Sequence, residues 1–300
     1  MYSSPEHSLN LSINNCEFRI KRDDLLPDFM GGNKVRKNSF ILSSLCNLPD
    51  VIITNGGAES NHARVCALMA ARLGIKCHLV LHGEEDKSRY LHGNQFFIDA
   101  TGAEVNYVNS DEIASTIEST KRKYESQGLD VFIIPGGGHS IDGARAYISA
   151  VDELDKEPDY IFFPSGTGAT HAGLLAGVKK KRWKTQVVGI SIARQEKRGI
   201  AAINELYRPL CLENNIEYDV SDIIFLDEFT FGGYSKYNTK LIDFINKFTS
   251  QTGVPFDPVY SGKALYGLTQ LVEQSKIPAN SKILFWHTGG LLNLQSSKAI

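Results

Sequence analysis

Short runs of β-branched and aromatic residues alternate with longer stretches of helical periodicity along most of the chain. In the first half, the pattern predicts strands at 51–54, 76–81 and 104–108, with helices at 61–73 and 90–100 between them. Strands separated by helices of this length are typical of βαβ units, in which helices cover a parallel sheet. The pattern therefore predicts an α/β fold with parallel sheets.

A second α/β unit is predicted after residue 130. Its elements are a strand at 131–135, a helix at 143–154, a strand at 160–163, a helix at 170–178 and a strand at 187–192. Later runs predict strands at 223–225 and 283–286, with a helix at 241–252 between them. The sequence has no internal repeat or low-complexity linker, so the limits of domains have to come from motifs.

Glycine is concentrated where predicted strands give way to helices. Such turns occur at 31–34, 55–62, 135–140, 164–173 and 287–290. A strand followed by glycine and a helix brings unpaired amides and the positive helix end to the carboxyl edge of the sheet, which suits a phosphate. PSGTGATHAG at 164–173 is the best candidate, although glycine there could also serve an ordinary capped turn.

The same segment matches neither GxxxxGK[ST] nor GxGxxG, which favours a smaller phosphate carrier such as pyridoxal phosphate. That cofactor needs a lysine that forms an imine with its aldehyde, a phosphate cradle, and partners for its phenolic oxygen and ring nitrogen. Lys34 is the best lysine, because two glycines precede it in MGGNKVRKN and a short helical stretch follows it. The simpler alternative for a single lysine is a place on the surface.

Composition and charge narrow the class of protein. The 300 residues are 42% hydrophobic and 22% charged, as in a globular chain of one large or two ordinary domains. Lys and Arg number 32 against 34 Asp and Glu, so no basic excess exists to attract nucleic acid or anionic lipid. We therefore expect neither nucleic acid nor a membrane among the partners.

The cysteines and the N-terminal segment bear on the compartment. The five cysteines are odd in number, scattered and without CxxC spacing, which predicts buried thiols in a reducing compartment. The N-terminal residues lack the pattern of a signal peptide, and no run approaches the roughly 20 apolar residues that span a bilayer. We expect a cytoplasmic protein.

Seven segments stand in collinear order between residues 19 and 292: IKRDDLLPDFMGGNKVRKN, GGAESNHARVCALMAARLGIKCHLVL, GNQFFIDATGAEV, IPGGGHSIDGARAY, PSGTGATHAGLLAG, DPVYSGKALYGL and ILFWHTGG. Together they resemble the 1-aminocyclopropane-1-carboxylate deaminase and D-cysteine desulfhydrase family of fold-type-II, tryptophan synthase β-like pyridoxal phosphate enzymes. The resemblance implies a large cofactor-binding domain of residues 1–37 and 149–300 and a small inserted α/β domain of 38–148. It also implies a cofactor in the cleft between them, and a homodimer.

The resemblance implies roles for the matched residues. Lys34 would be the Schiff-base lysine and the acid/base at the substrate α-carbon, and Asn61 would bind the phenolic oxygen. Ser60 would lie beside the substrate carboxylate as well as capping a helix. Thr288 would face the ring nitrogen, where a hydroxyl does not enforce protonation and so favours elimination. The phosphate would be held by Ser165, Gly166, Thr167, Gly168, Ala169 and Thr170.

Two tyrosines, and two positions that depart from the family's pattern, bear on the choice of substrate. Tyr260 in DPVYSGK and Tyr234 in FGGYSKYN would lie on the substrate side, although the second segment lacks the proline of the family's GYGxPN-like stretch. Ser261 stands where the deaminases carry Glu, which disfavours cyclopropane ring opening. Glu59 stands where many members carry Gln, and its charge could repel an acidic substrate or pair with a substrate amine.

The expected reaction is α,β-elimination from a small, D-cysteine-like amino acid to a 2-oxo acid and ammonia. Ring-opening deamination, racemisation and β-replacement remain open, as does a catalytically silent binding protein. A zinc site of His62, His139 and His171 is disfavoured because no HExxH or carboxylate pattern accompanies them, so no metal is expected. A serine hydrolase is disfavoured because GxSxG is absent.

Overall fold

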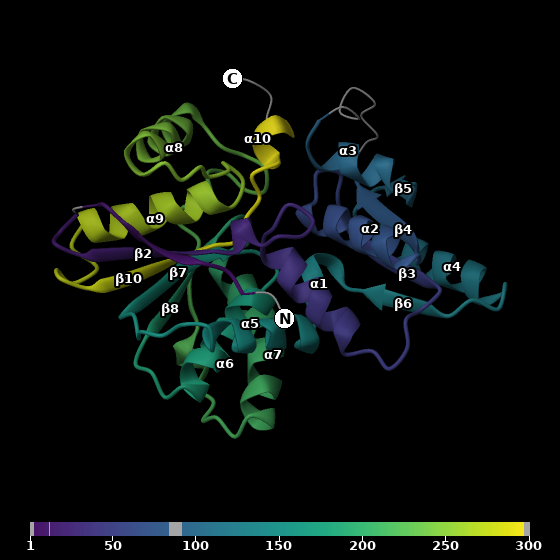
Figure 1. The fold of residues 1–300 in the computed structure, drawn as a ribbon, viewed down its shortest axis with the longest axis horizontal. Coiled ribbons are helices and arrows are strands. Elements are labelled where there is room, and N and C mark those ends of the chain that lie inside the picture. Colours follow the sequence, from purple (N-terminus) through teal and green to yellow (C-terminus); the bar gives the residue numbers. More distant parts are fainter. Residues whose placement is uncertain (1–2, 12, 84–91, 297–300) are drawn as a thin grey trace.

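The computed structural model describes residues 3–11, 13–83 and 92–296, and the larger of its two sheets makes up one half of the molecule (Figure 1). The strands of this sheet are β1 (Glu6–Leu9), β2 (Glu17–Arg22), β7 (Tyr160–Ser165), β8 (Gln186–Ser191), β9 (Ile224–Leu226) and β10 (Lys282–His287). They lie in the order β1-β2-β10-β7-β8-β9, and all neighbours are parallel except β1 and β2. The central strands β10 and β7 are almost wholly buried, as in parallel sheets covered on both faces.

Helices cover both faces of the larger sheet. One face carries α8 (Thr239–Thr252) and α9 (Ser261–Glu273), and the other carries α5 (Ile141–Val151), α6 (Ala169–Lys180) and α7 (Glu196–Glu213). Phe162 packs in the core under α8 and α9, whereas its neighbour Phe163 packs in the opposite core. Successive side chains of a strand face opposite sides, so one β7 sequence serves both cores.

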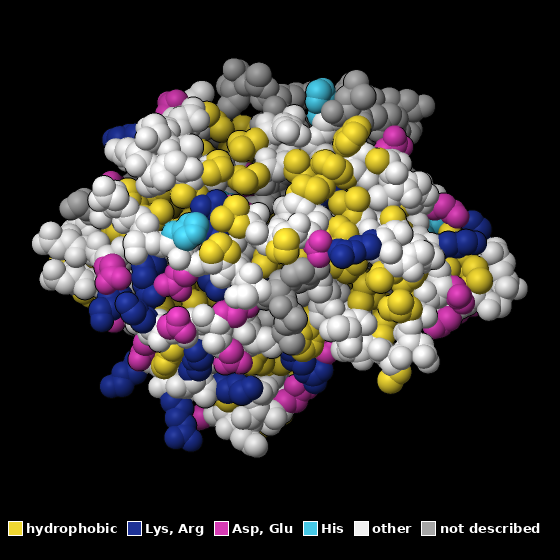
Figure 2. Space-filling view, in the orientation of Figure 1, with side chains coloured by type: hydrophobic (Ala, Val, Ile, Leu, Met, Phe, Trp, Pro, Cys, Tyr) yellow, Lys and Arg dark blue, Asp and Glu magenta, His cyan; other side chains and the backbone are white. Residues whose placement is uncertain are grey.

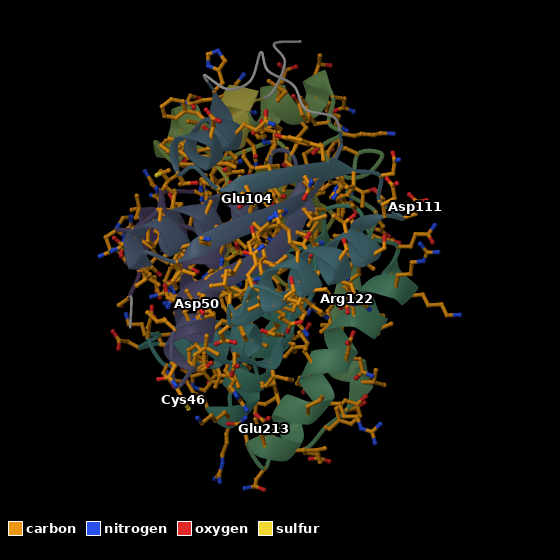
Figure 3. The ribbon with its side chains drawn as sticks, turned by 90° about the vertical axis from the view of Figure 1, so that its right-hand side faces the viewer. Cys46, Asp50, Glu104, Asp111, Arg122 and Glu213 are labelled. Atoms are coloured by element: carbon orange, nitrogen blue, oxygen red, sulfur yellow. The ribbon has the colours of Figure 1, made fainter. Side chains whose placement is uncertain are left out.

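The smaller sheet consists of β3 (Val51–Gly57), β4 (Lys76–His82), β5 (Glu104–Val108) and β6 (Val131–Ile134), in the order β5-β4-β3-β6 with every pair parallel. The core of one face includes residues of α1 (Asn33–Ser43), α2 (Asn61–Leu73) and α3 (Gly93–Ala100), and α4 (Ile113–Glu125) packs on the other. Figure 3 looks onto this end, where Glu104 and Arg122 lie at the surface.

The surface carries both signs of charge. In Figure 2, Lys and Arg side chains are interspersed with Asp and Glu side chains over α6 and α7. None of the described helices is both long enough and apolar enough to cross a membrane.

Four of the five cysteines are buried, and Cys46 is exposed near the edge of the small-sheet end (Figure 3), so the expectation of buried thiols is wrong for that residue.

The predicted α/β class is confirmed, and each predicted strand and helix has a counterpart. The start of the helix predicted at 90–100 falls partly outside the described residues, and α3 begins at Gly93. Sequence periodicity did not indicate β1, β2, α4, α7, α9 or the short α10 (Asn293–Ser296). Two of these helices have weak sequence patterns. Helix α4 buries only Thr120 and Tyr124, and α7 contains Pro209, which interrupts a helical pattern.

The smaller sheet falls within the predicted insertion of residues 38–148, and the larger sheet falls outside it. Helix α5 begins inside that range but packs in the core of the larger sheet, where the Tyr147 ring contacts the Trp286 ring edge-on. The limits of the two domains therefore stay a prediction.

Candidate active site

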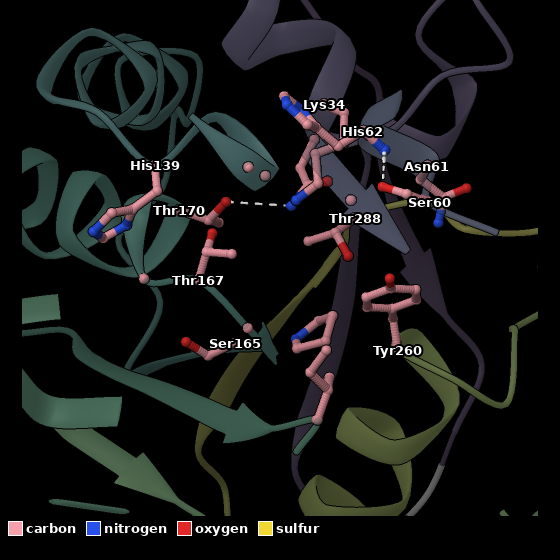
Figure 4. A pocket seen from close by; sticks show the side chains of 18 of the residues that line it. Lys34, Ser60, Asn61, His62, His139, Ser165, Thr167, Thr170, Tyr260 and Thr288 are labelled. Carbon is pink, nitrogen blue, oxygen red and sulfur yellow. Dashed lines mark hydrogen bonds between the residues drawn. The ribbon is translucent and has the colours of Figure 1, made fainter. Parts of the chain in front are cut away.

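A cavity of about 540 Å³ lies where the carboxyl ends of strands from both sheets meet (Figure 4). Gly57 ends β3 and Gly136 follows β6 from the smaller sheet, while Gly166, Ala193 and Thr288 follow β7, β8 and β10 of the larger one. Ligands of open α/β sheets bind at this edge, because loops and helix N-termini converge there. The cavity is the candidate active site.

The structure brings the residues predicted to bind the cofactor or act on the substrate to the walls of this cavity. Ala169 is the exception, because its side chain packs in the core beneath α6 and only its backbone can face a ligand. The residues that line the cavity are Lys34, Ser60, Asn61, Ser165, Gly166, Thr167, Gly168, Thr170, Tyr234, Tyr260 and Thr288.

Lys34 reaches the cavity from the first turn of α1. The preceding Gly32 has a φ of 96° and donates its N–H to the carbonyl of Asp23 at 2.6 Å. A Cβ at Gly32 would lie 2.8 Å from the carbonyl oxygen of Thr288, so only glycine allows this close approach. Asn33 N–H donates to the same Thr288 carbonyl at 2.9 Å, which joins the start of α1 to the end of β10.

Burial lowers the pKa of Lys34 to about 8, against the opposing effects of a hydrogen bond with Lys37 and of Cys66. About a tenth of such an amine is neutral at pH 7, whereas an ordinary lysine is almost wholly protonated. Only the neutral amine can attack a carbonyl carbon. Lys34 is therefore the candidate nucleophile of this cavity.

Lys37, one helical turn further along α1, is a second cavity lysine that the sequence analysis did not single out. Its side chain is buried and its Nζ donates to the carbonyl of Gly137. Burial and the neighbouring Lys34 lower its pKa well below that of an ordinary lysine. The KxxK spacing on a helix was the available signal, because residues three apart share one face.

A buried network behind the cavity fixes α1. Arg36 Nη2 donates to Asp23 Oδ1 at 2.7 Å, and Tyr147 and Trp286 donate to Asp23 Oδ2 at 2.7 and 2.9 Å. Burial alone would raise the pKa of Asp23, but Arg36 and these hydrogen bonds hold it below its usual value. The helix that carries Lys34 is thus attached to α5 and β10 from behind.

Ser60 and Asn61 begin α2 on the opposite side of the cavity. Ser60 Oγ accepts from the N–H groups of His62 and Ala63, both at 3.2 Å, which is an N-cap. Arg64 Nη1 donates to Asn61 Oδ1 at 3.2 Å, and in Figure 4 that oxygen is turned away from the centre of the cavity. The NH₂ group of Asn61 is then left to donate towards a ligand.

Arg64 is buried, and no described carboxylate lies within ion-pair distance of its guanidinium. Burial lowers its pKa to about 10. Its Nη1 also donates to Asn94 at 3.0 Å, which links α2 to α3. A buried cation with no described counter-ion beside Asn61 polarises that amide and strengthens its N–H donors.

The turn between β7 and α6 presents backbone to the cavity. Gly168 has a φ of 108°, and a Cβ there would lie 3.1 Å from the carbonyl oxygen of Ala202. Asn33 Nδ2 donates to Thr170 Oγ1 at 3.3 Å, which connects this turn to α1 (Figure 4). Amides at the N-terminus of α6 can bind an anion.

Tyr234 and Tyr260 form the remaining wall. Their hydroxyl groups lie 2.6 Å apart and their rings meet edge-on. The N–H of Tyr260 donates to Asp257 Oδ2 at 2.8 Å, which fixes the start of α9. Burial and the adjacent Tyr234 raise the pKa of Tyr260 well above its ordinary value, so this phenol stays protonated at neutral pH.

Comparison with known proteins gives this site a family. The family of pyridoxal-phosphate dependent enzymes matches residues 5–289, which is nearly the whole chain. The chain belongs to that family. Its cofactor is therefore pyridoxal phosphate, and the resemblance seen in the sequence is confirmed.

Two curated relatives place the enzyme more closely. A D-cysteine desulfhydrase of Serratia proteamaculans is 31% identical over 287 residues, which cover 91% of this chain and 86% of the relative. A Pyrococcus horikoshii protein, named provisionally as a 1-aminocyclopropane-1-carboxylate deaminase, is 33% identical over 280 residues, covering 91% and 84%. The enzyme belongs to the group that these two names define.

Solved structures have the same fold. The crystal structure of a 1-aminocyclopropane-1-carboxylate deaminase homologue superposes with a TM-score of 0.89 at 31% identity, covering 99% of this enzyme and 92% of that chain. A pyridoxal phosphate-dependent aspartate racemase shares the fold at a TM-score of 0.68 and 15% identity. The predicted fold-type-II architecture is confirmed.

The cavity fits the cofactor on its own geometry. An activated lysine lies on one wall, and a turn in which a Cβ at Gly168 would crowd the backbone lies on another. The three histidines considered for zinc lie around the cavity, but no group of three or more metal-binding side chains occurs in the described part of the enzyme. His62 and His171 are instead buried and neutral, because burial lowers both pKa values.

The two departures noted in the sequence lie outside the cavity wall. Ser261 is fully buried, and its Oγ donates to Asp257 Oδ1 at 2.6 Å. Glu59 Oε2 accepts from the N–H of Asn94 at 3.1 Å. Neither side chain lines the cavity, so any effect of these residues on a substrate passes through Asp257, Asn94 or the field of their charges.

Proposed function

We propose that this enzyme eliminates the β-substituent of a small amino acid of the D-cysteine type and releases a 2-oxo acid and ammonia. One observation carries the proposal: the described residues that line the cavity include lysines, hydroxyls, amides and histidines, but no Asp or Glu. Opening a cyclopropane demands a nucleophile or a strongly protonated cofactor ring that absorbs charge, and this wall has no described carboxylic acid that would keep such a ring protonated. A thiolate leaves a β-carbon without such help.

Bound pyridoxal phosphate would supply the electron withdrawal that makes the α-proton of an amino acid acidic. Lys34 would hold the cofactor covalently. Asn61, oriented by Arg64, would donate to the phenolic oxygen, and Thr288 would face the ring nitrogen without protonating it. The phosphate would bind the backbone of residues 165–170 at the N-terminus of α6, with the amine of Lys37 on the same cavity.

The remaining residues would act on the substrate. Lys34, with its lowered pKa, would take the proton from the α-carbon once its amine is released. Ser60 and the adjacent start of α2 would bind the substrate carboxylate, since its hydroxyl and the helix N-terminus face the cavity. The protonated Tyr234–Tyr260 pair would donate a hydrogen bond to the sulfur of the substrate and so hold its side chain in place.

The second candidate is ring-opening deamination of 1-aminocyclopropane-1-carboxylate. It is favoured by the names of the Pyrococcus relative and of the solved homologue. The cavity opposes it, because Ser261 is turned away and gives the wall no acid. We also propose that residues 1–37 and 149–300 form one domain and residues 38–148 the other, and that the enzyme is a homodimer acting on a small amino acid.

The test compares substrates on the purified enzyme with its cofactor. Borohydride reduction followed by peptide mass analysis is expected to place the cofactor on Lys34. Release of 2-oxo acid from D-cysteine is expected to exceed that from 1-aminocyclopropane-1-carboxylate by at least about tenfold in kcat/KM. A preference for the cyclopropane substrate would overturn the proposal, and a cofactor on another lysine would overturn the site.

A further inference from the structure

Lys263 lies in the first turn of α9, outside the cavity, and its side chain is fully buried. Its Nζ donates to three main-chain carbonyls: those of Ile192 at 3.1 Å, Thr230 at 2.8 Å and Gly233 at 2.7 Å. An ammonium group has three donors, so each is used. Three converging backbone carbonyls are also the kind of ligand set that binds a potassium ion.

The three carbonyls belong to two segments that wall the cavity. Ile192 follows β8, and its side chain packs on the turn before α6, where a Cβ at Gly166 would lie 3.3 Å from its Cδ1. Thr230 and Gly233 belong to the segment 227–238 between β9 and α8. One ammonium group therefore connects α9 to the phosphate side and to the tyrosine side of the cavity.

The segment 227–238 has a backbone that needs support. Phe231 and Ser235 have φ values of 52° and 57°, and Gly232 and Gly233 have values of 93° and 121°. A left-handed conformation is sterically unfavourable for a residue that has a Cβ. Tyr234 lies in the middle of this run, so the position of the Gly233 carbonyl fixes the place from which Tyr234 reaches Tyr260.

The charge at this position has a physical cost. No described carboxylate lies within ion-pair distance of Lys263, and burying an ammonium group is strongly unfavourable unless its donors are satisfied. Burial lowers its pKa to about 8, with the charge of Asp257 acting in the opposite direction. An apolar side chain could fill the same space without this cost, but it would leave three buried carbonyls without a donor.

We propose that the Lys263 ammonium group is a built-in cation that fixes the segment 227–238 against α9 and so positions Tyr234 beside Tyr260. Lys263 is a positioning residue, since its own side chain does not line the cavity. The effect on turnover rests on the proposed function, whereas the effect on the segment does not.

The test uses Lys263→Ala, Lys263→Met and, as matched control, Lys236→Met on the same segment, where Lys236 is exposed. Amide hydrogen exchange of residues 228–238 is expected to speed up at least about tenfold in both Lys263 variants and not in the control. Potassium or ammonium chloride is expected to restore protection in the alanine variant, whose emptied space admits the ion. Tetramethylammonium chloride at equal ionic strength is not expected to restore protection, because this cation is too large for the emptied space.

The steady-state kinetics give a second readout. The KM for D-cysteine is expected to rise at least about tenfold in Lys263→Ala, with cofactor affinity within about threefold of the wild type and with partial recovery in potassium. If the alanine variant fails to fold without salt, Lys263→Gln, which keeps two donors but no charge, is expected to show intermediate exchange and no response to potassium.

Three outcomes would overturn the inference. They are unchanged exchange in Lys263→Met, equal rescue by tetramethylammonium, or a loss of cofactor affinity as large as the loss of substrate affinity. If the wild type does not turn over D-cysteine, the proposed function fails, while the exchange experiment still decides the role of Lys263.

Discussion

The two sides of the cavity are built in different ways. The phosphate side consists of backbone, with the turn at 165–168 entering α6 and Gly168 in a conformation that side chains disfavour. The substrate side consists of side chains, chiefly the Tyr234–Tyr260 pair, held by contacts between segments far apart in sequence. Under the proposed function, the first wall would bind the phosphate group of the cofactor, whereas the second would distinguish between substrates.

The difference follows from what each wall has to recognise. A phosphate is bound by N–H groups at a helix N-terminus, so its site requires glycine and not particular side chains. An amino acid substrate differs from its competitors by one or two groups, which only side chains can distinguish. We therefore expect changes on the phosphate side to alter cofactor affinity, and changes on the substrate side to alter the choice of reaction.

Lys34 lies between the two walls, and its loss has the largest expected effect. Lys34→Ala is expected to lower kcat/KM by at least about 10⁴ and to abolish covalent attachment, because one amine serves both purposes. The melting temperature should stay near that of the wild type, since the residue stands at the cavity and truncation leaves no hole in the core. Activity assays, reduction with borohydride and calorimetry measure the three quantities, and residual activity above a hundredth would remove Lys34 from its role.

On the phosphate side, Gly168→Ala is expected to weaken cofactor binding about 30- to 100-fold. The φ of 108° and the Ala202 carbonyl at 3.1 Å from the new Cβ together cost about 2–3 kcal/mol. Fluorescence titration with pyridoxal phosphate measures the affinity. Gly102→Ala is the matched control, because Gly102 also has a positive φ but no atom within 4 Å of its Cβ position. Equal losses in both variants would show that strain alone, and not the wall, is responsible.

The lowered pKa of Lys34 predicts how attachment depends on pH. Only the neutral amine attacks, so the rate of covalent attachment to cofactor-free enzyme should rise about tenfold per unit below pH 8 and level off above it. Rapid mixing with pyridoxal phosphate between about pH 6 and about pH 10 measures this rate by absorbance. A rise that continues to the ordinary lysine value would mean that burial does not lower this pKa.

The same comparison explains what the sequence could and could not show. The residues of the phosphate side lie close together in the sequence. Glycine turns after apolar runs predict this wall, and GGNK before a helix predicts Lys34. The contacts of the substrate side join residues far apart in the chain, such as Lys263 with Ile192 and Gly233, and no spacing rule indicates such partners. Asp23 was missed for the same reason, because its partners Tyr147 and Trp286 lie more than a hundred residues away. Arg36 was missed because its partner Glu153 is 117 residues away.

Ser261→Glu is the substitution with the smallest expected effect on turnover, and it tests where specificity lies. The Ser261 hydroxyl donates to Asp257 in a fully buried position, so a glutamate there would face a second carboxylate whose pKa burial already raises. The like charges are expected to keep one of the two acids protonated near the floor of the cavity, where Gly290 separates Asp257 from the ligand space. That acid should raise ring opening of 1-aminocyclopropane-1-carboxylate relative to D-cysteine elimination by a few-fold at most, with some loss of stability.

Ser261→Ala, which removes the hydrogen bond and adds no acid, is the control. An equal change of the ratio in both variants would show that the bond to Asp257, and not an acid at position 261, decides between the two reactions.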